Sequence, residues 1–228
     1  SYHGKSFGAL SLTFNPKYRK AFAPLVEKVS FASYGDMESL RSVIDEDTAF
    51  IILEPIQGES GIIVAPDGFL QEVRKLCDEK GILLIFDEIQ AGLGRTGRLW
   101  ACDHWNTAPD ILCLAKGIAG GVPMGATLVR PDILAVINKG EHSSTFGGNP
   151  ISCAAGTAAL KALTEDGLIE NSEKMGKKFR EGLEKLKEKH TMIREIRGKG
   201  LMIGIEMKFE VRDILMGLIR EGVLMLYS

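Results

Sequence analysis

The sequence contains few cysteines, and none of them form a Cys-x-x-Cys pair. The four are spread widely along the 228 residues, at Cys77, Cys102, Cys113 and Cys153. This spacing argues against both a zinc site and a disulfide framework, so no metal is expected. It also favours a reducing compartment.

The sequence also lacks an excess of basic charge and a long apolar run. Its formal net charge is -2 and its isoelectric point is about 6.1, so the basic surface typical of a nucleic-acid-binding protein is not expected. No apolar run reaches the roughly 18 residues needed to span a bilayer, and the first residues do not resemble a signal peptide. We therefore expect a cytoplasmic protein that binds small molecules or other protein chains, and neither membrane nor nucleic acid.

The composition is that of an ordinary globular protein. Hydrophobic residues make up 45% and charged residues 25% of the chain, which is enough apolar material for one large core. The first residues already form a polar, glycine-containing motif, and no methionine precedes it. The chain is expected to be an internal piece of a longer protein.

The first half of the chain predicts an α/β fold. A short apolar run at 49–53 ends in Glu54-Pro55, where proline stops a strand. Apolar residues at helical spacing follow over 66–80, and a continuous apolar run at 82–86 has the pattern of a parallel strand buried on both faces. Strand, helix and strand in this order form a βαβ unit.

Two further apolar runs, at 111–115 and 126–129, predict neighbouring antiparallel strands. The glycine-rich link between them is too short for a crossover helix. The sheet is therefore expected to be mixed and mostly parallel, with helices on its flanks.

The second half of the chain changes character after Pro150. Helical patterns at 151–163 and 168–186 precede two strand patterns, at 192–197 and 201–207, and a last helix at 211–221. We expect residues 1–150 to form part of a large domain and 151–190 to be connecting helices. Residues 191–228 would begin a small α+β domain that is truncated.

Three of the predicted strand ends carry Glu54, Asp87 and Lys116. Ligands of open α/β sheets bind outside the carboxyl ends of the strands. A lysine and a carboxylate are what pyridoxal phosphate needs, because the lysine forms a Schiff base and the carboxylate keeps the ring nitrogen protonated. The alternative is that Asp87 caps a turn and Lys116 is a solvated loop lysine, which is the usual position of an isolated charged residue.

A set of short motifs, in this order, resembles the class III aminotransferases over essentially all of residues 1–228. The motifs are Tyr2-His3-Gly4-Lys5-Ser6, Glu54-Pro55-Ile56-Gln57-Gly58-Glu59, Asp87-Glu88-Ile89-Gln90-Ala91-Gly92, Gly94-Arg95-Thr96-Gly97, Pro109-Asp110-Ile111, Lys116-Gly117 and Ser144-Thr145-Phe146-Gly147-Gly148-Asn149-Pro150. The most similar branches act on acetylornithine, acetyl-lysine, putrescine or 4-aminobutyrate. The resemblance implies the type I fold of pyridoxal-phosphate enzymes and a homodimer whose active sites use both subunits.

The resemblance also implies how the cofactor is held. Lys116 would form the Schiff base and Asp87 would pair with the pyridinium nitrogen. Tyr2 and Ile89 would cover the two faces of the ring, and Gln90 would contact the ring hydroxyl. Glu88 belongs to the same cofactor-binding segment. A disordered terminal residue is the alternative for Tyr2.

Other implied roles concern the partner subunit and the substrate. Thr145 would reach the cofactor phosphate of the neighbouring subunit, and Ser144 would lie near the substrate. Glu59 would lie near the amino-donor pocket, and Glu54 would have a structural role. A simple turn at 147–150 is the alternative for the segment that carries Ser144 and Thr145.

Lys5 departs from the acetylornithine pattern. That branch usually has arginine here to bind the substrate carboxylate, whereas lysine offers a point charge without the bidentate fork. The His-Gly-Lys-Ser form resembles the putrescine branch. A solvated lysine is the alternative for Lys5.

Two glycine motifs suggest other functions. The run Gly92-Leu93-Gly94-Arg95-Thr96-Gly97 matches the dinucleotide fingerprint of nicotinamide-dependent dehydrogenases. However, it does not follow its strand directly, and no convincing helix follows it. Gly4-Lys5-Ser6 resembles the end of a P-loop, but the earlier glycine and strand of that motif are missing.

The reaction we expect is transfer of an amino group from an ω-amine donor to a 2-oxo acid, which by resemblance is 2-oxoglutarate. Aminomutases, racemases and decarboxylases share the scaffold and remain alternatives, as does an inactive structural fragment. The family's upstream phosphate-binding segment and downstream arginine are missing. We therefore expect the 228 residues alone to bind pyridoxal phosphate poorly.

Overall fold

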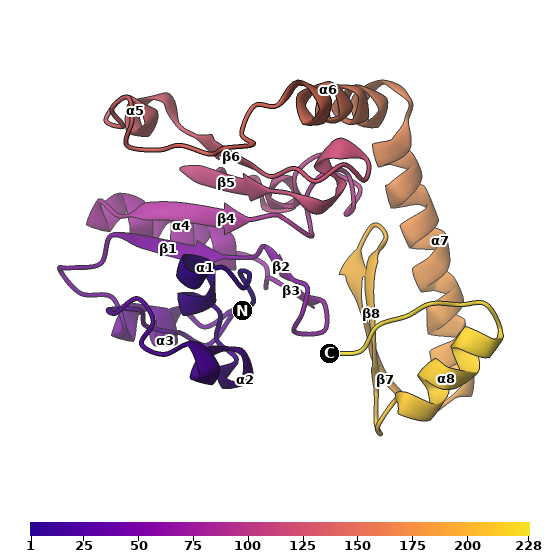
Figure 1. Ribbon diagram of the computed structural model, residues 1–228. Coiled ribbons are helices and arrows are strands. Elements are labelled where there is room, and N and C mark those ends of the chain that lie inside the picture. The colour runs from indigo at the N-terminus through magenta and orange to yellow at the C-terminus, as the bar shows by residue number, and fades with distance from the viewer.

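A computed structural model describes residues 1–228. Its largest sheet has the strand order β1-β4-β5-β6 (Figure 1), formed by β1 (Phe50–Leu53), β4 (Leu83–Asp87), β5 (Ile111–Leu114) and β6 (Ala126–Val129). The first three strands are parallel, and β6 runs antiparallel to β5. The predictions of a βαβ unit and of an antiparallel pair after it are confirmed.

Helix α4 (Phe69–Lys80) covers one face of this sheet. Its apolar stripe is fully buried and belongs to the same core as Leu84 and Phe86 of β4. The helix begins three residues later than predicted, because its N-cap Gly68 has a left-handed backbone with φ of 82°. It ends at Gly81, also left-handed, whose N–H closes the last turn.

Short helices precede the sheet in the chain. They are α1 (Phe7–Ser11), α2 (Pro16–Arg19), the 3₁₀ turn η1 (Lys20–Phe22) and α3 (Met37–Ser42). The sequence predicts no element here, because helices this short have no sustained apolar period. Local signals are present all the same: side-chain oxygens of Asn15 and Asp36 accept backbone N–H groups at the starts of α2 and α3.

A two-stranded hairpin that the sequence pattern did not predict follows β1. Its strands β2 (Ile56–Gln57) and β3 (Ile63–Val64) are two residues each, and they pair antiparallel. Pro55 lies between β1 and β2, and its carbonyl accepts the N–H of Ala65, which closes the base of the hairpin.

Three short helical segments connect the later strands. They are η2 (Ala101–Trp105), η3 (Lys116–Ala119) and α5 (Pro131–Leu134). The loop from α5 leads into α6 (Pro150–Glu165), which packs against η3 and so lies over the end of β5.

Helix α7 (Leu168–Lys189) leads away from the large sheet to a second hairpin, as Figure 1 shows. This hairpin pairs β7 (Ile193–Lys199) with β8 (Met202–Met207), and α8 (Arg212–Arg220) follows it. Helix α7 packs against both strands, and β7 also contacts β3. The predicted helices, strands and last helix of this half are confirmed.

The glycine run at 92–97 connects the two parts of the molecule. The carbonyl of Arg95 accepts the hydroxyl of Ser172 on α7 and the N–H of Leu201 in the β7–β8 turn, each at 2.9 Å. A Cβ atom on Gly97 would lie 2.7 Å from that of Glu173, so glycine is needed for close packing. The glycines that give this run the spacing of a dinucleotide fingerprint thus allow the 92–97 segment to pack closely against α7 and the β7–β8 turn.

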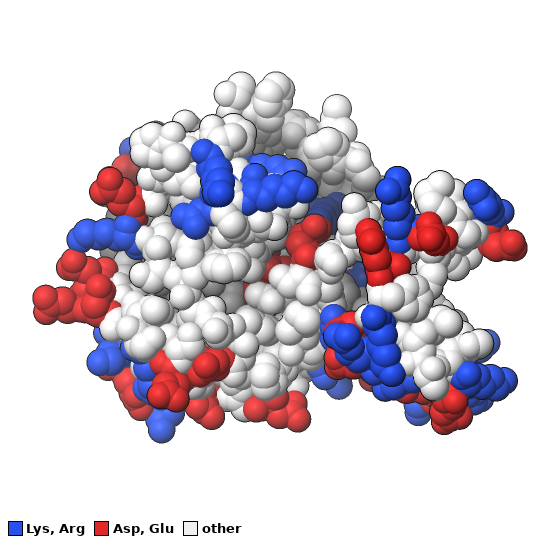
Figure 2. Space-filling view, turned by 90° about the horizontal axis from the view of Figure 1, so that it is seen from below, with Lys and Arg blue, Asp and Glu red and all other residues white.

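The surface carries charges of both signs. On the face drawn in Figure 2, lysine and arginine side chains lie beside aspartate and glutamate, mostly toward the periphery. No helix is long and apolar enough to cross a membrane. All four cysteines are free thiols.

Candidate active site

The carboxyl ends of β4 and β5 bring Asp87 and Lys116 to the same edge of the sheet. Asp87 is the last residue of β4 and pairs in register with Cys113 of β5. Lys116 follows the last residue of β5 by two positions. The prediction that these two residues belong to neighbouring strand ends agrees with this placement.

A buried histidine holds Asp87. Nδ1 of His3 lies 2.8 Å from Oδ2 of Asp87, and both side chains are over 90% buried. In the tautomer with hydrogen on Nδ1, the imidazole donates and the carboxylate oxygen accepts. The backbone N–H of Ile89 donates to Oδ1 at 3.0 Å, so each carboxylate oxygen has a partner.

His3 is the residue of this site that the sequence patterns did not predict. It lies 84 positions from Asp87 and is fixed by its own backbone N–H, which donates to the hydroxyl of Thr13 at 2.9 Å. Its position inside the Tyr2-His3-Gly4 motif was the only signal available. Such long-range pairs are not visible in local sequence patterns.

Lys116 has an unusual backbone conformation. Its φ is +47°, in the left-handed region that a non-glycine residue rarely adopts, and Ala115 before it is also irregular. The side chain is exposed to solvent. Strain of this kind is found mainly at functional sites, where the surrounding structure compensates its cost of about 1–3 kcal/mol.

Glu54 connects the N-terminal segment to the β2–β3 hairpin. Its two carboxylate oxygens accept the backbone N–H groups of Tyr2, at 3.3 Å, and Gly58, at 2.9 Å. Burial raises the pKa of Glu54, and these two hydrogen bonds act in the opposite direction. The contacts agree with the structural role expected for Glu54.

Tyr2 and Lys5 share a neighbour, Tyr18 of α2. The rings of Tyr2 and Tyr18 meet edge to face with centroids 5.8 Å apart, and Nζ of Lys5 lies 5.0 Å from the centroid of Tyr18. Tyr2 is therefore packed and half-buried, unlike a disordered terminal residue.

Ile89 and Gln90 follow directly after Asp87 and Glu88, and both are half-buried. The amide of Gln90 lies against Gly58 in the β2–β3 hairpin. This contact places Gly58, which follows β2, next to the segment that follows β4.

Glu88 points away from this edge. Its side chain is fully buried, and its oxygens accept the N–H groups of Ala101 and Cys102 at 2.6 and 2.7 Å. Burial raises the pKa of Glu88, against the effect of these hydrogen bonds. With both oxygens occupied, Glu88 anchors the start of η2, and its place in the cofactor-binding segment stays a prediction.

We expect Glu88→Gln to lower the free energy of unfolding by about 1–3 kcal/mol, because an amide group cannot accept both N–H bonds and leaves a buried donor unpaired. Chemical denaturation measures this. The control is Asp103→Asn in η2. The carboxylate of Asp103 accepts a single, exposed hydrogen bond from the N–H of Trp100, and this bond is longer, at 3.3 Å. A Glu88 variant as stable as this control would contradict the anchoring role.

The structure does not bring Glu59, Ser144 or Thr145 into contact with Asp87 or Lys116. Glu59 is exposed in the turn of the β2–β3 hairpin. Ser144 and Thr145 are exposed in the loop between α5 and α6, and the carbonyl of Ser144 accepts the N–H of Gly147 in a turn.

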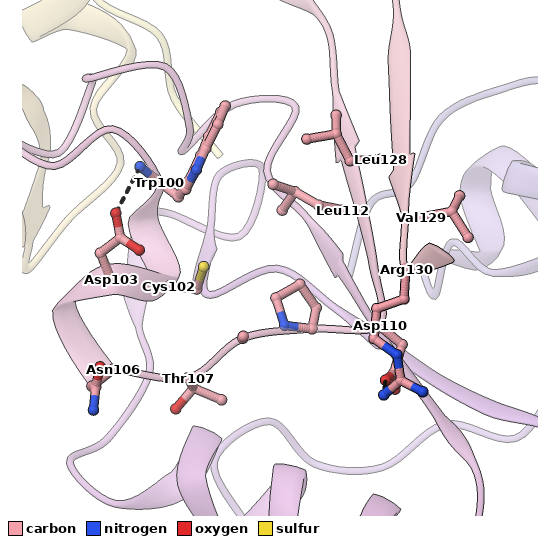
Figure 3. Close-up of a pocket in the computed structure, with 12 residues that line it drawn as sticks. Trp100, Cys102, Asp103, Asn106, Thr107, Asp110, Leu112, Leu128, Val129 and Arg130 are labelled. Atoms are coloured by element: carbon pink, nitrogen blue, oxygen red, sulfur yellow. Dashed lines mark hydrogen bonds and ion pairs between the residues drawn. The ribbon is translucent and has the colours of Figure 1, made fainter. Parts of the chain in front are cut away.

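A separate cavity lies on the other face of the sheet. It has a volume of about 390 Å³ and is lined by η2, the 106–110 loop and the ends of β5 and β6 (Figure 3). Leu112 and Leu128 point into it, and Leu112 precedes Cys113, the partner of Asp87. Successive side chains of a strand point to opposite faces, so this cavity is separate from the candidate active site.

Asp110 at the rim of this cavity is structural. Its buried carboxylate accepts the N–H of Leu84 and pairs with Arg74 and Arg130. These contacts connect β4, α4 and Arg130, the residue after β6, so they explain the Pro109-Asp110-Ile111 motif without a ligand.

The arrangement of a strand-end carboxylate, its histidine partner and a strained lysine is that of a known class of enzymes. The sequence matches the model of the family Aminotransferase class-III over residues 1–228. The chain therefore belongs to the class III aminotransferases, as its motifs predicted.

Two relatives are similar to nearly the whole of this chain. The chain is 47% identical over 225 residues to an acetylornithine aminotransferase of Caldanaerobacter subterraneus subsp. tengcongensis, covering 98% of this chain and 57% of the relative. It is 44% identical over 225 residues to ornithine aminotransferase 1 of Staphylococcus saprophyticus, again covering 98% of this chain and 57% of the relative.

A solved structure of the ornithine aminotransferase of Toxoplasma gondii, with partial occupancy of pyridoxal phosphate at its active site, superposes with a TM-score of 0.95. It is 38% identical, and the match covers 99% of this chain and 55% of that one. The expected fold, a mixed and mostly parallel sheet flanked by helices as in type I pyridoxal-phosphate enzymes, is confirmed. The chain spans about half the length of the curated relatives it matches.

Proposed function

We propose that the protein is a pyridoxal-phosphate-dependent aminotransferase that moves an amino group from an ω-amine donor to a 2-oxo acid, 2-oxoglutarate being the favoured acceptor. The observation that carries the proposal is the buried His3–Asp87 pair at the end of β4, beside the strained Lys116 after β5. Membership of the class III family supports the same reaction.

The side chains at this edge fit pyridoxal phosphate. Asp87 is buried and both of its carboxylate oxygens have hydrogen-bond partners, so its side chain is held in place where a protonated ring nitrogen would need it. Lys116 is an exposed primary amine one strand away. Tyr2 and Ile89 offer an aromatic and an aliphatic surface for a flat ring, and Gln90 offers an amide for its hydroxyl.

When bound, the cofactor supplies an aldehyde that bonds to amines and a ring that accepts the electron pair released when a C–H bond breaks. Nζ of Lys116 would hold the cofactor through that aldehyde and, once free, would move a proton at the donor carbon. The carboxylate of Asp87, which His3 holds in place, would keep the ring nitrogen protonated.

Donor selection is proposed to depend on Lys5, with Glu59 and Ser144 near the same pocket. Nζ of Lys5 lies over the ring of Tyr18, which also contacts Tyr2, the residue proposed to cover one face of the cofactor ring. A lysine binds a carboxylate less tightly than the bidentate fork of arginine. This favours ω-amines, including donors without a carboxylate, over α-amino acids.

A donor screen with the full-length holoenzyme tests the proposed function. Putrescine, acetylornithine, ornithine and 4-aminobutyrate are compared with α-amino acids by measuring glutamate formed from 2-oxoglutarate. We expect Lys5→Arg to lower the KM for acetylornithine by about fivefold, equivalent to about 1 kcal/mol, and to leave putrescine unchanged. Reaction with α-amino acids alone would overturn the donor assignment.

We further propose that the active protein is a homodimer in which Thr145 binds the cofactor phosphate of the partner subunit. Thr145 is exposed in the loop between α5 and α6 and has no contact with Asp87 or Lys116 of its own chain. A hydroxyl placed in this way can serve a site only if another chain brings that site to it.

Mixed dimers test this arrangement. A Lys116→Ala subunit paired with a Thr145→Ala subunit has one site with both defects and one with neither, if Thr145 serves the partner. We expect the mixed dimer to regain the cofactor affinity of the unsubstituted protein at half of its sites. If Thr145 served its own subunit, no site would regain that affinity. An active, cofactor-saturated monomer in sedimentation would also refute the proposal.

A further inference from the structure

Gly58 lies against the amide of Gln90. The glycine is buried in the β2–β3 hairpin, just after β2, and Gln90 follows Asp87 by three residues. A Cβ atom built on Gly58 would overlap Oε1 of Gln90 and come within 3.3 Å of its Nε2. The side chain of Gln90 therefore occupies the space that any other residue at position 58 would need.

The backbone does not require glycine at this position. The φ of Gly58 lies outside the left-handed region, whereas Gly61 in the same hairpin has φ of +91°. The N–H of Gly58 donates to Oε2 of Glu54 at 2.9 Å, and alanine would keep this bond. Space for Gln90 is thus the structural reason for glycine here.

The hairpin cannot easily move away from Gln90, because it is held on both sides. Glu54 and the carbonyl of Pro55 fix its base. At its tip, Nε of Arg197 on β7 donates to the carbonyl of Gly61 at 2.8 Å, and Arg197 is itself paired with Glu195 and Glu206. A side chain at position 58 would therefore displace Gln90 and leave the hairpin in place.

We propose that Gly58 is a positioning residue whose missing side chain fixes the amide of Gln90 toward the cofactor ring. This inference rests on the proposed function, in which Gln90 contacts the ring hydroxyl. It adds that the Glu54-Pro55-Ile56-Gln57-Gly58 motif acts on the cofactor through Gln90, from a hairpin that also contacts β7.

A double-mutant cycle in the full-length protein tests the inference with Gly58→Ala, Gln90→Ala and the double variant. The readouts are the dissociation constant of pyridoxal phosphate and the pH dependence of its visible absorbance band when bound. We expect each single variant to weaken cofactor binding about tenfold and to shift the absorbance titration in the same direction. The double variant should match Gln90→Ala alone, because the shortened residue 90 leaves room for the new methyl group.

The control is Gly182→Ala, a glycine on α7 with open space around it, which should change neither readout. Gly58→Ala with unchanged cofactor binding, or effects that multiply in the double variant, would overturn the inference. If Gly58→Ala fails to fold, folding of the double variant supports it and failure of both overturns it.

If Gln90→Ala binds the cofactor normally, the role of Gln90 and this inference both fail. The proposed function is tested separately, by identifying the lysine to which the cofactor is bound.

Discussion

Replacing Lys116 with alanine is expected to reduce kcat by at least about 10³-fold, because the variant loses both the amine that holds the cofactor and the group that moves the proton. Stability should change little, because the side chain is exposed and alanine has about the same backbone strain as lysine at φ of +47°. Steady-state transamination with 2-oxoglutarate measures the first expectation and thermal unfolding the second.

The matched control is Lys185→Ala, an exposed lysine on α7 far along the chain from the candidate active site, which should keep the kcat of the unsubstituted protein. Addition of a small primary amine is expected to restore part of the activity of Lys116→Ala, because a free amine can act as the missing base. A Lys116 variant that keeps a tenth or more of the normal kcat would show that another residue moves the proton.

Asp87→Asn is expected to lower kcat by about 10²- to 10³-fold, the usual loss when one charged or hydrogen-bonding group that stabilises a transition state is removed. The substitution keeps the shape of the side chain and an oxygen for the N–H of Ile89. It therefore removes the charge that holds a proton on the ring nitrogen and leaves the packing in place. The visible absorbance of the bound cofactor provides a second readout that folding alone does not change.

His3→Gln is the companion to this variant. Glutamine can still donate to Asp87 but is not fixed by an imidazole ring, so we expect a smaller loss, about tenfold in kcat. In the double variant the two effects should not multiply, because His3 acts through Asp87. Near-normal turnover by Asp87→Asn would refute the role of Asp87 and, with it, that of His3.

The strands and long helices of this fold were predictable because their signals are local. The continuous apolar run before Asp87 and the helical spacing before Gly81 identified β4 and α4 to within a few residues. Asp87 and Lys116 were found because they follow buried strands, and strand ends converge by topology. The motif resemblance then supplied roles that periodicity alone does not contain.

What the sequence did not reveal depends on contacts between distant segments. The His3–Asp87 pair spans 84 residues, and the Arg197–Gly61 hydrogen bond spans 136. The β2–β3 hairpin was missed because strands of two residues have no measurable alternation. The hydrogen bonds that turn the carboxylate of Glu88 toward η2 join it to residues 13 and 14 positions away, which no local pattern shows.

The most direct test of the account is to reduce the full-length holoenzyme with borohydride, which fixes the cofactor to the lysine that carries it, and to map the modified peptide. The account predicts a visible absorbance band that reduction abolishes, and one modified peptide containing Lys116. Modification of a different lysine, or a protein that takes up no pyridoxal phosphate, would contradict it.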